Sequence, residues 1–173
     1  MKNPSAEPFS DPTFSHLTLV GKSVTGAVGN GLLLRRGTRG KIHNALIVGL
    51  PRFGLDIEGD QTAIHAGNGT LGIFNSIFAN TNNFAEGDAD KDKGLIESTW
   101  ALDTKLGNRT EDLAKIAFGS VAITAIDLKQ TAGSPALTGS KSPDDIFFDK
   151  VDFIGACGTD CSEFAGWTAF PDK

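Results

Sequence analysis

The sequence predicts an all-β fold, a parallel β-solenoid in which successive coils of the chain stack short strands in register. The first observation is a repeat: residues 14–21 (FSHLTLVG), 42–49 (IHNALIVG) and 73–80 (IFNSIFAN) align without gaps, at steps of 28 and 31 residues. The second is an interleaved series, GLLLR at 31–35 and GLDIE at 54–58, with a step of 23 residues. A parallel solenoid stacks equivalent positions about 4.8 Å apart. An antiparallel sandwich is the alternative, but it does not require matched positions at matched steps.

Each copy of the first repeat ends in a Gly or Asn turn signal, which is typical of a short strand. The third position is polar in every copy: His16, Asn44 and Asn75. The apolar residues expected to face inward lie two positions before it or three after it: Phe14, Ile42 and Ile73, then Leu19, Ile47 and Phe78. This spacing breaks strict alternation and predicts a corner where the chain bends. Asn suits a corner because it tolerates left-handed backbone angles, and its amide can bond the next Asn in the stack.

The composition, 39% hydrophobic and 21% charged in 173 residues, indicates one domain with enough apolar side chains for a core. Over 1–173 we expect an N-terminal extension (1–12), the coils (13–140, with an insertion loop at 82–94) and a C-terminal cap or tail (141–173). The net charge of −5 argues against a nucleic-acid partner. No apolar run is long enough for a membrane span, and the first residues lack the apolar region of a signal peptide.

The chain after the third copy is less regular. Residues 110–118 (TEDLAKIAF) begin with a capping residue and acidic residues, which predicts a helical turn. Residues 120–128 (SVAITAIDL) predict a strand, and residues 134–140 (SPALTGS) predict a turn with a short further rung. The tail at 146–156 (IFFDKVDFIGA) is aromatic and apolar, so we expect it to seal the end of the solenoid.

Four cations lie within seven residues at an expected turn: Arg35, Arg36, Arg39 and Lys41. As a ligand-binding site they would grip the carboxylates or sulfates of an acidic polysaccharide through bidentate guanidinium pairs. The alternative is structural: some of these side chains tie the turn to backbone carbonyls or to acidic residues of neighbouring coils, while the rest are solvated. Lyase chemistry would need a general base and nearby carboxylates, which the sequence around this turn does not supply.

The second candidate site is the acidic stretch EGDADKDKG at 86–94. Its alternating carboxylates suit calcium, with Asp88, Asp90 and Asp92 as the candidate ligands. The stretch departs from an EF-hand loop because Gly94 is at the seventh position rather than the sixth, and two lysines offset part of the charge. An exposed insertion loop without a metal is the alternative.

The histidines and cysteines do not form a catalytic pattern. His16 takes a corner position, which favours a hydrogen-bonded member of the stack, and His43 and His65 have no partner at triad or metal spacing. Cys157 and Cys161 cannot by themselves complete a four-ligand zinc site. A local disulfide and two free thiols both stay open.

Three segments resemble a known family: NGLLLRRGTRGKIHNALIVGLPRFGLDIEG (30–59), GSPAL (133–137), and FFDKVDFIGAC (147–157) followed by GWTAF (166–170). They are similar to the C-terminal part of a family of bacterial, often marine, uncharacterised surface or secreted proteins. In that family a right-handed parallel β-helix ends in an FFD-x-V-D-(Y/F)-x-GA segment and a W-T-x-(G)-W-T phrase. Here the first tryptophan of that phrase is missing, and Cys157 replaces an aromatic residue. The resemblance implies a right-handed parallel β-helix and a cell-surface or extracellular location, and no established reaction.

These features predict a non-catalytic structural or adhesive module at the cell surface or outside the cell. Its stacked strands would present a long face to glycans, to protein partners or to other copies of the chain. The alternative is a fragment of a polysaccharide lyase or hydrolase that acts on acidic polysaccharide. An uncapped solenoid end exposes unpaired strand groups, so we also expect self-association at that end.

Overall fold

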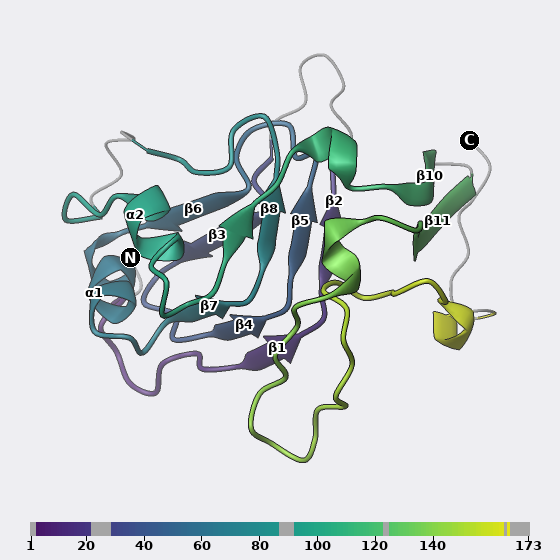
Figure 1. Ribbon diagram of the computed structural model, residues 1–173. Coiled ribbons are helices and arrows are strands. Elements are labelled where there is room, and N and C mark those ends of the chain that lie inside the picture. Colours follow the sequence, from purple (N-terminus) through teal and green to yellow (C-terminus); the bar gives the residue numbers. More distant parts are fainter. Residues whose placement is uncertain (1–2, 22–28, 87–91, 123–124, 165, 167–173) are drawn as a thin grey trace.

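The computed structural model consists of three small parallel sheets and one antiparallel hairpin (Figure 1). It describes residues 3–21, 29–86, 92–122, 125–164 and 166. The first sheet contains β1 (Thr13–Ser15), β4 (Lys41–His43) and β7 (Gly72–Phe74). The second contains β2 (Thr18–Val20), β5 (Leu46–Val48), β8 (Ile77–Ala79) and β9 (Arg109–Thr110), and the third contains β3 (Leu32–Arg35) and β6 (Leu55–Glu58). From β1 to β8 the chain visits the first, second and third sheets in strict cyclic order.

Strands of successive repeats pair in parallel, in the register that the sequence repeat predicts. Phe14 pairs with Ile42, which pairs with Ile73 on its other side. Leu19, Ile47 and Phe78 pair in the same way in the second sheet, and Leu32 pairs with Leu55 in the third. The parallel stacking of both repeat series is therefore confirmed.

The chain turns between the first and second strands of each repeat at one residue with a positive φ: His16 (57°), Asn44 (54°) and Asn75 (49°). This confirms the predicted corners. Backbone groups join neighbouring corners, since the Asn44 N–H donates to the carbonyl of Phe74 at 2.9 Å. Within the described chain, no corner amide bonds the next, so the expected amide ladder is not formed. A fourth corner, Gly107 (φ 70°), precedes β9. The alignment of the repeats did not predict it, because its residue is glycine rather than Asn or His.

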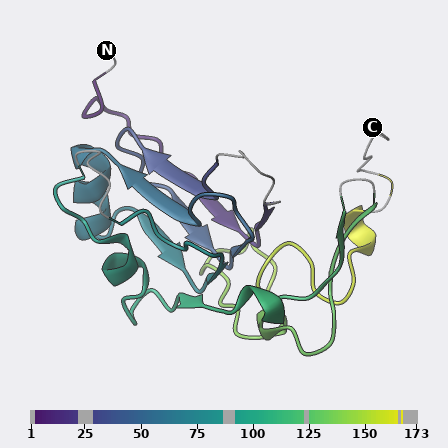
Figure 2. The ribbon, with the colours of Figure 1, turned by 90° about the horizontal axis from the view of Figure 1, so that it is seen from above.

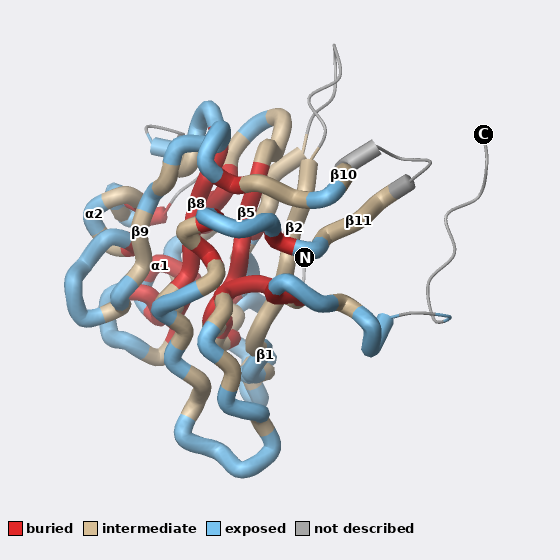
Figure 3. Tube along the Cα trace, turned by 45° about the vertical axis from the view of Figure 1, so that its right-hand side comes forward, coloured by how far each residue is buried: buried red, intermediate tan, exposed pale blue. Residues whose placement is uncertain are grey.

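The inward-facing side chains form the main core, whose buried members include Ile42, Ile47, Leu55, Ile57, Ile73 and Phe78 (Figure 3). Two helices that the sequence did not predict lie at its edge, α1 (Asp60–Gly67) and α2 (Glu97–Ala101). Trp100 of α2 packs against this core, and its Nε1 donates to the carbonyl of Ala66 in α1 at 3.0 Å. No described residue covers the first repeat in this way, and its Phe14 is therefore 47% exposed.

The chain after β9 differs in part from the prediction. The 3₁₀ turn η1 (Leu113–Lys115) confirms the expected helical turn. In place of one strand at 120–128, β10 (Phe118–Ala122) and β11 (Ala125–Gln130) form an antiparallel hairpin (Figure 2). The one-strand prediction was wrong because alternation has the same period in both arms of a hairpin, and no Asn-Gly or Asp-Gly pair marks the reversal. Two further 3₁₀ turns follow, η2 (Pro135–Leu137) and η3 (Ser162–Phe164), and no rung forms at 134–140 within the described chain.

The described part of the C-terminal tail packs along the flank of the second sheet rather than over an end of the sheets. Ile154 is fully buried in a second cluster with the outward-facing Leu46, Val48 and Ile77. The Gly155 N–H donates to the carbonyl of Asn44 at 2.8 Å. The expected end seal was therefore wrong for this segment. The physical reason is that the second sheet is apolar on both faces, so its outer face also has to be covered.

Candidate ligand-binding site

The basic turn joins β3 to β4 at the edge of the third sheet. Arg36 (φ 58°) and Gly37 (φ 76°) both have left-handed backbone angles. The Gly37 N–H donates to Oγ1 of Thr62 in the first turn of α1 at 3.0 Å, and Thr62 is fully buried. The turn is therefore fixed against α1 by a buried hydrogen bond.

Three of the four predicted ligand-binding cations are paired with acidic residues. Arg35 Nη1 lies 3.4 Å from Glu58 Oε2, across the paired strands β3 and β6. Arg39 Nη2 lies 3.2 Å from Glu7 Oε1, and Lys41 pairs with Asp11. These pairs are solvent-accessible, so each contributes about 0–1 kcal/mol to stability. The Arg39 and Lys41 pairs tie the N-terminal segment to the turn, and all three pairs offset part of the positive charge that a ligand would need.

The Arg39 guanidinium also stacks on the ring of Phe9, with its central carbon 4.0 Å from the ring centroid. The Phe9 ring in turn meets His65 edge-on at 4.6 Å. The buried His65 is held by Gln61 Nε2, 2.9 Å from its Nε2, and by the carbonyl of Thr38, 3.2 Å from its Nδ1. Arg39 and His65 are thus structural members of the contact between the N-terminal segment and α1.

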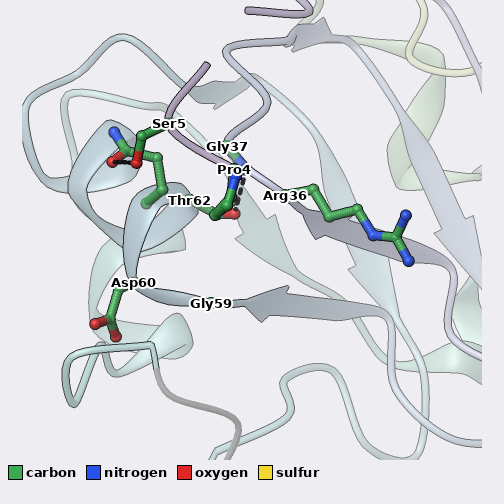
Figure 4. Close-up of a pocket in the computed structure, with 8 residues that line it drawn as sticks. Pro4, Ser5, Arg36, Gly37, Gly59, Asp60 and Thr62 are labelled. Atoms are coloured by element: carbon green, nitrogen blue, oxygen red, sulfur yellow. Dashed lines mark hydrogen bonds between the residues drawn. The ribbon is translucent and has the colours of Figure 1, made fainter. Parts of the chain in front are cut away.

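Arg36 differs from the other three cations. Its side chain is exposed, and it forms no ion pair with any described residue. The guanidinium extends away from the first turn of α1, along β3 and β6 (Figure 4). Of the predicted cluster, Arg36 is the cation whose charge no described acidic side chain offsets.

A pocket of about 150 Å³ lies beside Arg36. It is lined by the N-terminal segment, the basic turn and the start of α1: Pro4, Ser5, Arg36, Gly37, Gly59, Asp60, Gln61 and Thr62. Ser5 Oγ and Gln61 Oε1 are 3.1 Å apart on one side (Figure 4). Asp60 points away from Arg36, and its Oδ2 lies 3.9 Å from Lys93 Nζ. The pocket combines a small apolar hollow with the Arg36 cation at its rim, which pairs with no acidic side chain in the part of the chain that the structure describes.

Sequence reasoning identified Arg36 but missed the other walls of this pocket. The signal for α1 is the length of a connection: residues 59–71 separate β6 from β7, whereas residues 36–40 separate β3 from β4. The longer connection has room for a helix of eight residues. Pro4 and Ser5 could not be placed from the sequence, because they lie outside every repeat.

The predicted calcium ligands are placed only in part. Asp88 and Asp90 lie outside the described residues. Asp92 is 8% exposed, and its Oδ1 accepts a hydrogen bond from the Gly94 N–H at 2.9 Å. Among the described residues, no group of three His, Cys, Asp or Glu side chains is arranged to hold a metal ion.

Two histidines lie close together at one edge of the first sheet, His16 at the first corner and His43 at the end of β4. His16 Nδ1 is 2.8 Å from the Ser15 hydroxyl, and the ring meets Phe153 edge-on at 5.8 Å. His43 stacks on Phe74 with ring centroids 4.6 Å apart. Burial lowers the pKa of His16, and burial together with the nearby His16 lowers the pKa of His43. No described hydrogen bond or ion pair joins His16 to a carboxylate, so this contact does not make a Ser-His-acid triad.

Cys157 and Cys161 form a disulfide, with Cα atoms 5.3 Å apart. Gln130 Nε2 donates to the carbonyls of Ile154 and Cys157, at 2.8 and 2.7 Å, and so ties the residues before the disulfide to β11. The bridge closes a short loop at the base of the hairpin, away from the basic turn (Figure 1).

Residues 1–120 match the family described as the pectate-lyase like beta helix domain. The match covers more than half of the chain, which therefore belongs to this family of β-helix proteins. Searches of curated proteins and of solved structures each found no match. Among the described residues, no helix has the length and apolar character to cross a membrane.

Proposed function

We propose that this protein is a non-catalytic binding module for acidic polysaccharide, located at the cell surface or outside the cell, and that its three parallel sheets are the faces of a right-handed β-helix. Membership of the pectate-lyase-like β-helix family supports a polysaccharide-related role. The parallel register of the sheets supports the coil. The basic turn supplies the contact with the ligand.

The observation that carries this proposal is the position of Arg36. It is an exposed guanidinium that pairs with no described acidic side chain, and it stands at the rim of a pocket. A guanidinium can form two parallel hydrogen bonds to a carboxylate or sulfate. Ser5 and Gln61 line the same pocket and offer polar atoms to sugar hydroxyls. The arrangement fits an anionic sugar unit better than a neutral one.

Binding without catalysis is favoured by the groups beside the pocket. Of the described residues that line it, Asp60 is the one carboxylate, and it faces Lys93 rather than Arg36. His16 lies at the first corner and His43 at the end of β4, and neither lines the pocket. A lyase or hydrolase needs a base or an acid within reach of the bond that is broken.

The test is direct binding of oligouronates to the wild-type protein and to Arg36→Ala, measured by calorimetry. A hydrogen bond to a charged group contributes about 1.5–3 kcal/mol, so Arg36→Ala should weaken binding by roughly 10- to 100-fold. Arg52→Ala, which removes an exposed arginine outside the pocket, is the matched control and should bind as the wild type does. Equal binding by both variants would remove the basis of the proposal.

A second candidate function, a lyase acting on acidic polysaccharide, is favoured by the same family match. It predicts unsaturated uronate products, detected by ultraviolet absorbance, and calcium dependence if Asp88, Asp90 and Asp92 hold the ion. The non-catalytic proposal predicts no product in the presence or absence of calcium. Calcium-dependent turnover that is lost in Asp90→Asn would contradict the non-catalytic proposal and would favour the lyase.

A further inference from the structure

We propose that the tip of the loop 140–152 is a protein-binding element, and that it docks into the pocket beside Arg36 on a second copy of this chain. The tip consists of Ile146 and Phe147. In the contact, the Phe147 ring fills the pocket, Ile146 packs against its rim, and Asp144 pairs with Arg36 of the second copy.

The two side chains of the tip are large and apolar, yet they are exposed to solvent. Ile146 is fully exposed and Phe147 is 83% exposed, the highest values among the large hydrophobic side chains that the structure describes. They are adjacent at the middle of the loop 140–152, and this loop projects from the sheets (Figure 1). Single exposed apolar residues are common, but a clustered pair on a projecting loop is typical of an interaction site.

The loop is held in a defined shape. Ser142 Oγ donates to the carbonyl of Asp149 at 2.9 Å, and the Phe147 N–H donates to Asp145 Oδ1 at 2.8 Å. At the base of the loop, the Lys141 N–H donates to Asn44 Oδ1 at 2.9 Å, and the Lys141 carbonyl accepts from Asn44 Nδ2 at 3.1 Å. A tip that is already ordered loses little conformational entropy on binding.

Charge selects the partner. Asp144, Asp145 and Asp149 surround the two apolar residues, and Lys150 is the nearest cation in the sequence. Anionic membrane surfaces attract basic segments, so an acidic tip is unsuited to them. The tip instead requires a protein surface that offers an apolar hollow next to a cation.

This chain has such a surface in the pocket beside Arg36. Its volume is about 150 Å³, and a cavity of about 150 Å³ accepts a benzene ring, the size of the Phe147 ring. Arg36 supplies a cation that no described acidic group neutralises. The carboxylate of Asp60 faces Lys93, which reduces its repulsion of an acidic tip.

The tip and the pocket lie on separate parts of the molecule: the start of α1 lines the pocket, whereas the loop 140–152 extends beyond β1, away from α1 (Figure 1). The contact is therefore made between two copies. Because the two surfaces differ, each copy can use its tip and its pocket at the same time. Such a heterologous contact builds open chains rather than a closed dimer.

This inference relies on the pocket of the proposed function as a binding site, but not on a glycan as its ligand. The Phe147→Ser variant separates the two proposals, since it removes the tip and leaves Arg36 intact. Oligouronate binding by this variant tests the glycan function alone, and its self-association tests the docking alone.

The experiment is sedimentation velocity over a range of protein concentrations. The wild type should grow beyond a dimer as concentration rises, and less so at high salt, because the Asp144–Arg36 pair is screened. Phe147→Ser should raise the midpoint concentration roughly tenfold or more, as expected for a central aromatic contact. Ile96→Ser, which removes a side chain that is 54% exposed elsewhere, is the matched control and should associate normally.

Charge reversal provides the second arm. Arg36→Glu and Asp144→Arg should each abolish association, and the double variant Arg36→Glu/Asp144→Arg should restore it; circular dichroism verifies folding. A wild type that stays monomeric at every concentration overturns the proposal. So does association that survives Phe147→Ser but is lost in Phe14→Ser, because the contact would then lie at the open end of the first repeat.

Discussion

Asn44 both holds a corner of the chain and anchors the C-terminal loop. Its backbone is left-handed (φ 54°), its side chain is fully buried, and its amide makes two hydrogen bonds with the backbone of Lys141. Asn75 has the same corner geometry (φ 49°) but makes no such contact with the loop. The pair therefore separates the backbone role of a corner residue from its side-chain role.

Glycine is the informative substitution, because it adopts a positive φ without steric cost. Asn44→Gly keeps the corner and removes these two hydrogen bonds together with the longer one from Asn44 Nδ2 to Ser15 Oγ (3.4 Å), so the free energy of unfolding should fall by about 1–3 kcal/mol. Asn75→Gly should change it by less than about 1 kcal/mol. Urea denaturation measures both. Equal losses would mean that the contact with Lys141 contributes nothing to stability.

His16 and His43 make stability depend on pH. Burial lowers the pKa of both imidazoles below the ordinary value of 6.5, to which they return in the unfolded chain. Between the folded and unfolded pKa values the unfolded chain binds more protons, so stability rises with pH. The contribution is complete above pH 6.5 and is lost as the pH falls through the folded pKa.

His16→Asn tests this dependence, because Asn occupies the same corner in the other two copies of the repeat. Urea midpoints measured between about pH 5.5 and pH 8, above the range where most carboxylates titrate, should fall with decreasing pH in the wild type. The fall should be smaller in His16→Asn. An unchanged slope in the variant would mean that His16 is not one of the groups responsible.

Strands and turns could be predicted from the sequence where they repeat along the chain. A parallel stack places equivalent residues over one another, so β1, β4 and β7 have an apolar residue at the same position. The residue at each corner is Asn or His, and this polar residue indicates the left-handed backbone there. α1, α2 and the hairpin β10–β11 occur once each, and nothing in the chain can be compared with them. Their positions depend on tertiary contacts, such as the hydrogen bond between Trp100 and Ala66.

The same reasoning explains the candidate site. A run of cations is visible in a sequence, but the acidic partners of Arg39 and Lys41 come from the N-terminal segment, about 30 residues away in sequence. Only the folded arrangement shows that these charges are paired, and that Arg36 has no acidic partner among the described residues. The pocket was equally hidden, because its walls come from three separate segments.

At the scale of the whole molecule, the second sheet separates two apolar clusters. Its inner face packs in the main core, next to Trp100, and its outer face is covered by Ile116, Ala136 and Ile154. The C-terminal segment is also bonded to Asn44 and, through the Ala156 N–H, to Thr18 Oγ1 at 2.8 Å. These contacts join residues 154–156 to the first two repeats, so we expect both clusters to unfold in one cooperative transition.

Ile154→Ala tests this coupling, because Ile154 is fully buried and belongs to the outer cluster. Its truncation should lower the free energy of unfolding by about 2–5 kcal/mol, whereas Ile146→Ala, at a fully exposed position, should be neutral in the monomer. The chain has two tryptophans, so in a Trp167→Phe background fluorescence follows Trp100, which packs against the main core on the other side of the sheet. If the clusters are coupled, Ile154→Ala shifts the urea midpoint seen by Trp100 as much as the one seen by circular dichroism. A Trp100 transition that stays in place while the dichroism transition moves would show that the C-terminal segment unfolds independently of the sheets it covers.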